Sequence, residues 1–210
     1  MKMRTDMSVG ADMTIAYELG VSLYLNITNR CPCNCTFCIR RNNDGVNYGE
    51  SLWLDHEPNL DEIFAVLHKI PEDALKKYDE VVFCGYGEPT ERLDVMLECA
   101  KYIKSKKCRV RLNTNGLSDL INEKETAALL EGYIDSVSIS LNAPDSETYS
   151  ELCLPVFGSG SYDAIIRFAK DCKKYIPEVV MSVFGPALDE SDITKCRDVC
   201  ESLDIPMKVR

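Results

Sequence analysis

Two hydrophobic periods alternate along the chain, and each predicts a different element. Residues 21–28 alternate apolar and polar side chains, which is the period-two pattern of a β-strand. Residues 15–19, followed by Gly20, have the composition of a shorter strand that pairs with it as a hairpin. Over residues 60–70 the apolar positions recur every three or four residues, which predicts an amphipathic helix that Pro71 ends.

The same cycle continues to the end of the chain. Further strands are predicted over 80–84, 109–113, 136–140, 179–183 and 207–209. Further helices are predicted over 93–103, 122–130, 162–175 and 191–203. Strands that alternate with helices imply right-handed crossovers and a parallel sheet. A closed eight-stranded barrel takes about 250 residues, so six strands predict an α/β fold: an open, partial (β/α)6 TIM-like barrel, forming a single domain over 21–210 after an N-terminal arm over 1–20.

Composition and charge argue against several classes of function. The chain has 34 acidic and 24 basic residues, a formal net charge of −10, and therefore no basic surplus for extended nucleic-acid binding. No apolar run approaches the length of a membrane span, and the N-terminus lacks the apolar core of a signal peptide. We therefore expect a cytoplasmic protein that does not enter a membrane.

Cysteine provides the first candidate chemistry. Eleven cysteines, an odd count in a chain without a secretion signal, argue for free thiols rather than a disulfide framework. Cys31, Cys35 and Cys38 are close together, and soft thiolates select iron-sulfur clusters or zinc. Three such ligands leave one iron of a four-iron cluster open, as a catalytic metal site requires. With Cys33 as a fourth ligand, the alternative is a zinc site.

Glycine and small polar residues follow the next predicted strands. They occupy 85–89, 113–116 and 138–142. Ligands bind outside the carboxyl ends of parallel strands, where the loops converge. We therefore expect these three segments and the cysteine segment to form one site.

The cysteine segment, Cys31-x-x-x-Cys35-x-Phe37-Cys38, resembles the defining motif of the radical SAM superfamily. The run Gly85-Tyr86-Gly87-Glu88-Pro89 is similar to that superfamily's Gly-Gly-Glu-Pro element, with Tyr86 where the first glycine often stands. The runs that begin at Asn113 and Ser138 resemble its other cofactor-binding strand ends.

This resemblance implies a radical SAM enzyme whose cofactors are a 4Fe-4S cluster and S-adenosyl-L-methionine (SAM). Cys31, Cys35 and Cys38 would bind the cluster, and reductive cleavage of SAM would yield methionine and a 5'-deoxyadenosyl radical that abstracts hydrogen from an unidentified substrate. The SAM-binding residues that it implies are Phe37, Gly85, Tyr86, Gly87, Glu88, Asn113, Thr114, Asn115, Ser138, Ser140 and Asn142. A one-electron donor such as a flavodoxin or ferredoxin would be a partner. For Glu88, bracing of its own turn is the favoured alternative to a contact with the SAM ammonium.

A narrower resemblance covers residues 15–210. The runs 24–32, 52–54, 82–89 and 137–145 look like the small radical SAM family encoded beside TatD-type nucleases. This implies a functional link to such a nuclease and does not identify a substrate. Within the enzyme class, the alternative is a 7-carboxy-7-deazaguanine synthase or a glycyl-radical-activating enzyme. Outside it, the alternatives are a non-catalytic iron-sulfur or zinc-binding module and a scaffold that partners a nuclease.

Several residues outside these motifs have two interpretations. Trp53, in the long segment 40–57, is either part of a lid or a cap on the open edge of the barrel. Of Arg40 and Arg41, we expect at most one to serve the site. Cys196 and Cys200 are buried structural thiols or the start of an auxiliary cluster, and Cys153 is expected to be a reactive thiol on a loop.

Overall fold

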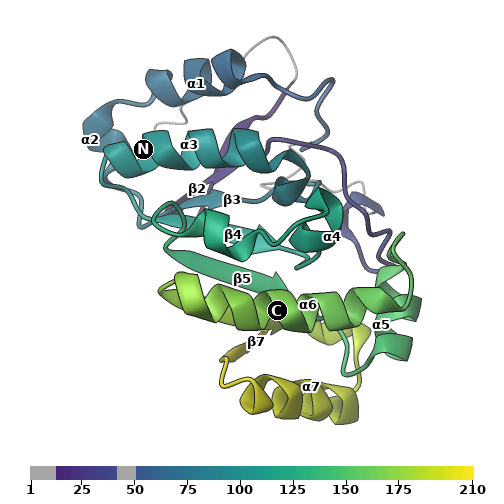
Figure 1. The fold of residues 1–210 in the computed structure, drawn as a ribbon. Coiled ribbons are helices and arrows are strands. Elements are labelled where there is room, and N and C mark those ends of the chain that lie inside the picture. Colours follow the sequence, from purple (N-terminus) through teal and green to yellow (C-terminus); the bar gives the residue numbers. More distant parts are fainter. Residues whose placement is uncertain (1–12, 42–50) are drawn as a thin grey trace.

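The computed structural model describes residues 13–41 and 51–210 (Figure 1). Seven strands form one sheet in chain order. They are β1 (Ala16–Leu19), β2 (Ser22–Leu25), β3 (Val81–Phe83), β4 (Val110–Thr114), β5 (Ser136–Ser140), β6 (Glu178–Val183) and β7 (Met207–Val209). Neighbours from β2 to β7 are parallel, and β1 pairs antiparallel with β2 across the turn at Gly20. The predicted single-domain partial barrel and its N-terminal hairpin are confirmed.

The helices connect successive parallel strands. They are α1 (Leu60–Lys69), α2 (Glu72–Leu75), α3 (Leu93–Ser105), α4 (Ser118–Asn122), α5 (Ser146–Cys153), α6 (Gly160–Tyr175) and α7 (Glu190–Ser202). Short 3-10 helices lie at η1 (Ile39–Arg41), η2 (Pro89–Arg92), η3 (Ala127–Leu130) and η4 (Gly185–Ala187). Helices α3 and α6 lie over one face of the sheet (Figure 1), where α3 contacts β4 and α6 contacts β5 and β6. Within the described part of the chain, no helix is both long and apolar enough to cross a bilayer.

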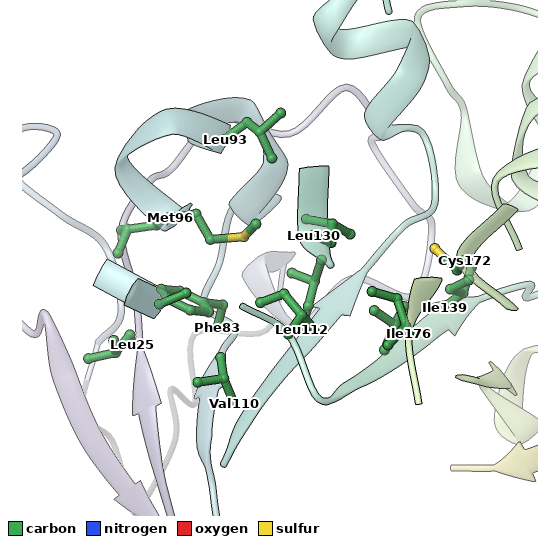
Figure 2. Packing of buried hydrophobic residues seen from close by; sticks show 14 of the residues in the cluster. Leu25, Phe83, Leu93, Met96, Val110, Leu112, Leu130, Ile139, Cys172 and Ile176 are labelled. Atoms are coloured by element: carbon green, nitrogen blue, oxygen red, sulfur yellow. The ribbon is translucent and has the colours of Figure 1, made fainter. Parts of the chain in front are cut away.

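The two faces of the sheet differ in polarity because successive strand residues point to opposite sides. Phe83, Leu112 and Ile139 lie on the helix-covered face and belong to one buried cluster with Met96 of α3 and Cys172 of α6 (Figure 2). Full burial of such an apolar side chain contributes about 1.5–3 kcal/mol to stability. This cluster joins the sheet to α3 and α6.

The concave face is polar. The strand pairing places the side chains of Arg111, Asn113, Ser138, Ser140 and Ser182 on the side opposite the buried cluster. The sheet therefore carries a row of polar side chains on the face opposite the buried cluster.

The helix predicted over 122–130 is wrong. Helix α4 ends at Asn122, and Glu123 takes a left-handed conformation with φ of 52° that stops it. The side chain of Asp119 then accepts hydrogen bonds from the backbone and hydroxyl of Thr126, at 2.8 and 2.7 Å. These local bonds divide the segment into α4 and the separate turn η3, because side-chain acceptors compete with helical pairing.

Helix α5 is absent from the predicted elements, although a strong cap starts it. The side chain of Asp145 accepts a hydrogen bond from the backbone N–H of Thr148 at 2.8 Å, as an N-cap residue does. Cys153 is the last residue of this helix and is buried, so its predicted place on an exposed loop is wrong. Two further helices start one or two residues earlier than predicted, at Gly160 and Glu190.

Candidate functional site

The cysteine segment leaves the carboxyl end of β2 and is held there by the last residues of α5 and the chain that follows them. The backbone N–H groups of Asn34 and Thr36 donate to the carbonyls of Cys153 and Leu152, at 3.1 and 2.8 Å. In return, the N–H of Val156 donates to the carbonyl of Pro32 at 2.9 Å. We call residues 32–36 and 152–156 the cysteine ladder. These bonds fix the backbone between Cys31 and Cys35, the first two candidate metal-binding cysteines.

The five thiols near this ladder differ in burial. Cys31, Cys35 and Cys38 are half-buried, whereas Cys33 and Cys153 are fully buried. The Cys33 sulfur lies 3.7 Å from the hydroxyl of Tyr149 on α5. The thiols within reach of solvent are therefore the three that the motif names, and Cys33 points into the protein.

Hydrogen bonds between these thiols distinguish Cys31 and Cys35 from their neighbours. The pKa of Cys35 is lowered because the Cys153 thiol, and then the Cys33 thiol, donate hydrogen bonds to it, which outweighs desolvation. The pKa of Cys31 is lowered in the same way by Cys33. The pKa values of Cys33 and Cys153 are raised, first because each acts as the donor and then by burial. Thiolate, the form that binds metal, is thus favoured at Cys31 and Cys35.

Arg40 supplies positive charge at the same place. Its guanidinium donates to the carbonyls of Cys33 and Asn29, at 2.9 and 3.3 Å. The pKa of Arg40 is raised: desolvation alone would lower it, but a hydrogen bond to Cys38 and the charges of the nearby cysteines outweigh that effect. Arg41 instead bonds Asn34 at the exposed surface. Of this pair, Arg40 is the residue that faces the thiols.

Glu88 connects the ends of two strands. It is 3% exposed, and its Oε1 accepts from the backbone N–H of Thr90 and from the hydroxyls of Thr90 and Thr114, at 3.1, 2.8 and 2.8 Å. Its Oε2 accepts from the backbone N–H of Asn115 at 2.7 Å. Desolvation raises the pKa of Glu88 even against these donors. These contacts support the bracing interpretation of Glu88, with both oxygens occupied by the protein.

Gly85 and Gly87 are needed for packing within the protein. A Cβ at Gly85 would lie 2.0 Å from Oδ1 of Asn26, and one at Gly87 would lie 2.3 and 2.6 Å from the carbonyl oxygens of Thr28 and Arg30. The loop after β3 therefore packs directly on the start of the cysteine segment. From the sequence, a ligand was expected to approach the backbone at these glycines. In the structure, the groups that approach them belong to the chain around Asn26, Thr28 and Arg30.

The aromatic residues of the motifs pack against partners that the sequence did not single out. Phe37 stacks on Phe184, which follows β6, with ring centroids 5.2 Å apart. Tyr86 is buried with Tyr17 and Leu52, and Trp53 lies edge-on to Tyr86 with centroids 5.2 Å apart. Trp53 is 47% exposed, so it covers the β1 and β2 side of the barrel in the manner of a cap. Residues 42–50 of the proposed lid lie outside the described residues.

The remaining predicted residues lie along the carboxyl ends of β4 and β5. Asn113 has a buried Oδ1 without a hydrogen-bond partner, and the same holds for the hydroxyl of Ser182 on the neighbouring concave row. Ser140 accepts from the guanidinium of Arg210 at 3.3 Å. Asn142, at a left-handed φ of 57°, accepts from the backbone N–H of Phe184 at 3.2 Å. The structure thus brings the four predicted segments to one edge of the sheet.

A cavity of 560 Å³ lies at the opposite edge of the sheet, where the amino ends of β3 to β7 meet. Its lining includes Arg109, Arg111, Ser136, Ser138, Glu178 and Lys208. Arg111 is held by Glu80 at 3.0 Å and by the hydroxyl of Tyr24 at 3.2 Å. Sequence reasoning missed this arginine, although its place in a period-two strand with apolar neighbours marks the concave row.

Of the cysteines away from the motif and the ladder, Cys84 is half-buried and the others are buried. Cys196 and Cys200 are buried in α7, and burial raises their pKa values to about 12 and about 11. Within residues 13–41 and 51–210, no three His, Cys, Asp or Glu side chains converge to bind one metal ion. A single zinc ion needs every thiolate about 2.3 Å away, whereas a four-iron cluster takes one cysteine per iron. Three accessible soft donors on one loop, with Arg40 beside them, fit such a cluster.

The sequence of this chain is similar to those of known proteins. The family described as the Radical SAM superfamily matches residues 25–200. A GTP 3',8-cyclase of Corynebacterium glutamicum is 30% identical over 199 residues, which cover 90% of this chain and 47% of that protein. A probable dual-specificity RNA methyltransferase RlmN of Pseudothermotoga lettingae is 29% identical over 150 residues, which cover 67% of this chain and 39% of that protein. The chain spans about half the length of the first of these relatives and less of the second.

A solved structure shows the same fold. SuiB of Streptococcus suis, in its complex with S-adenosylmethionine, matches 88% of this chain and 39% of its own, with a TM-score of 0.63 and 18% identity. At this identity, the likeness shows the shared architecture alone.

Proposed function

Because the chain belongs to the radical SAM superfamily, whose members bind a 4Fe-4S cluster and SAM, we propose that Cys31, Cys35 and Cys38 bind three irons of such a cluster. The observation that carries this proposal is the accessibility of these three thiols at the carboxyl edge, beside Cys33 and Cys153, which are buried. When bound, the cofactors would supply reductive cleavage of SAM and a 5'-deoxyadenosyl radical that abstracts hydrogen from a substrate.

The chain's own residues would orient the cofactors and exclude water from them. The cysteine ladder fixes the spacing of the ligand loop, and Arg40 offsets part of the negative charge of three thiolates. Backbone groups of 85–87, held in place by Glu88, lie at the edge where the SAM ammonium would bind. Asn113, Ser138 and Ser140 offer donors and acceptors to the carboxylate and ribose.

We place the substrate on the polar concave face. The unpartnered Oδ1 of Asn113 and hydroxyl of Ser182 lie on the same face of the sheet, opposite the buried cluster. Buried polar atoms without partners are costly unless a ligand or water satisfies them. Asn113 and Ser182 each stand one residue before the carboxyl end of their strand, so a substrate bound to them would lie beside the proposed cofactor edge.

Two partners complete the proposal. Cluster reduction needs a one-electron donor, and a flavodoxin or ferredoxin provides that chemistry. The resemblance to the family encoded beside TatD-type nucleases suggests a functional link to such a nuclease, and co-purification of the two proteins would test it.

The decisive experiment is anaerobic. Iron and sulfide are reconstituted into the wild-type protein, dithionite and SAM are added, and 5'-deoxyadenosine is assayed. We expect release by the wild type and by the matched control Cys33→Ala, because Cys33 is buried and is not a ligand. Release should fall at least 100-fold in Cys35→Ala. Equal release from Cys35→Ala and the wild type would refute the assignment.

A further inference from the structure

The side-chain amide of Asn115, just beyond β4, is fixed in one orientation. Its Oδ1 accepts a hydrogen bond from the backbone N–H of Leu117 at 2.9 Å, which forms an Asx turn. The backbone N–H of Asn115 donates to Oε2 of Glu88 at 2.7 Å, so the residue is held from both sides. With Oδ1 committed to the turn, the direction of the NH₂ group is determined by the backbone.

That NH₂ group faces two sulfurs. Its Nδ2 lies 3.9 Å from the sulfur of Cys31 and 4.0 Å from the sulfur of Cys33. An amide nitrogen carries two hydrogens, so it can donate to both acceptors. Cys31 is a proposed cluster ligand and Cys33 is not, and the contact with Cys31 therefore reaches the inner coordination sphere.

We propose that Asn115 is a positioning residue that donates an N–H···S hydrogen bond to Cys31 and thereby raises the reduction potential of the cluster. This inference rests on the proposed function. Reduction adds negative charge that is shared by the cluster and its cysteine sulfurs. A donor aimed at one sulfur stabilises the reduced form more than the oxidised form, and hydrogen bonds to sulfur are among the factors that set cluster potentials.

Asn115 also connects Cys31 to parts of the chain that are distant in sequence. The ladder bonds of 32–36 begin at the carbonyl of Pro32, one residue after Cys31. The Asn115 amide links the Cys31 side chain to β4, and through Glu88 to the loop after β3. The proposed ligand is therefore connected to two strand ends that are far from it in sequence.

The test measures the midpoint potential of the reconstituted cluster by an EPR-monitored redox titration without SAM. Asn115→Ala removes the donor without adding charge, and Asn115→Asp keeps the acceptor for Leu117 but replaces NH₂ by oxygen. We expect the equilibrium constant for reduction to fall about tenfold in Asn115→Ala, a shift of about 59 mV to more negative potential for a one-electron couple. Asn115→Asp should shift further in the same direction.

Two controls separate the alternatives. Asn122→Asp, at the end of α4, removes the amide that donates to the carbonyls of Thr90 in η2 and Ser118 in α4, and it should leave the potential unchanged. The Asn115→Ala shift should also persist in a Cys33→Ala background, because the effect acts on Cys31.

Each other outcome has a definite meaning. An unchanged potential in Asn115→Ala, or a shift that disappears in the Cys33→Ala background, would overturn this inference while the proposed function stands. A wild-type protein that shows no 4Fe-4S EPR signal after reconstitution and reduction would overturn both.

Discussion

Glu88 illustrates how single residues organise the carboxyl edge. Its two oxygens receive backbone N–H groups on opposite sides, from Thr90 and from Asn115. A glutamine at this position has one oxygen and one NH₂ group, so one of these buried N–H groups loses its acceptor whichever way the amide turns. An unsatisfied buried donor costs about 1–3 kcal/mol.

We therefore predict that Glu88→Gln lowers the free energy of unfolding by about 1–3 kcal/mol. The exposed Glu201→Gln serves as the control and should change stability by less than about 0.5 kcal/mol. Urea unfolding of the two metal-free variants measures this difference. Equal stability of both variants would show that the bracing contacts of Glu88 contribute nothing.

Glycine substitutions give a second prediction at this scale. In Gly87→Ala the new Cβ meets backbone oxygens that cannot move aside, so we expect a loss of about 1–3 kcal/mol, as for overpacked cores. Gly160, the first residue of α6, has nothing within 4 Å of a Cβ and no left-handed φ. Gly160→Ala should instead stabilise the fold by about 0.4–1 kcal/mol. Thermal unfolding measures both variants: Gly87→Ala should lower the Tm and Gly160→Ala should raise it.

Sequence alone located these residues but not their partners. The motif around Gly85 and Gly87 predicted a close approach, and the approaching groups prove to be Asn26 and the carbonyls of Thr28 and Arg30. Those contacts join segments about 60 residues apart in the chain. No local pattern encodes such a pair, so the role of each glycine emerged only with the tertiary structure.

At the scale of elements, α5 matters because its end forms one side of the cysteine ladder. Asp145 caps the start of α5, and Asp189 caps the start of α7 through the backbone N–H of Asp192 at 2.8 Å. Loss of either cap costs about 1 kcal/mol. Only α5 leads directly into residues that bond the ligand loop.

We therefore predict that Asp145→Ala and Asp189→Ala lower the unfolding free energy by similar amounts, about 1 kcal/mol each. Only Asp145→Ala should also reduce the iron bound after reconstitution, by about twofold or more, measured as iron and sulfide per chain. Equal iron content in the two variants would show that the cysteine ladder does not depend on α5.

The helices differ in how well they can be predicted from their sequences. Helices α1, α3 and α6 carry apolar residues on one face over several turns, and all three were predicted. Helix α5 buries only Tyr149 and Cys153, so its periodic signal is short and its cap was the better indicator. The segment 122–130 has helix-forming residues, but the Asp119 bonds to Thr126 override that propensity.

For the whole molecule, the repeated strand-helix cycle was enough to predict the architecture. Each parallel crossover is right-handed and local, so a chain that repeats it has few alternative topologies. The polar concave face needed the strand register, because a shift of one residue would exchange Asn113 and Ser138 with the buried row. The site therefore follows from the fold only after the register is known.

The proposed function couples cofactor binding to the stability of the whole molecule. A ligand that binds only the folded protein adds about 2.7 kcal/mol of stability at 100 times its Kd. For a chain of this length, that corresponds to a rise in Tm of about 5–10 °C. Since the proposed SAM site includes an open iron of the cluster, SAM at this concentration should raise the Tm of the reconstituted protein and leave that of the metal-free protein within about 1 °C.

The variant Cys38→Ala should show no rise in Tm with SAM after reconstitution. Its Tm without metal should equal that of the wild type, because the half-buried Cys38 thiol is outside the core. An equal rise in metal-free and reconstituted protein, measured by anaerobic calorimetry, would mean that SAM binds this fold without the three cysteines.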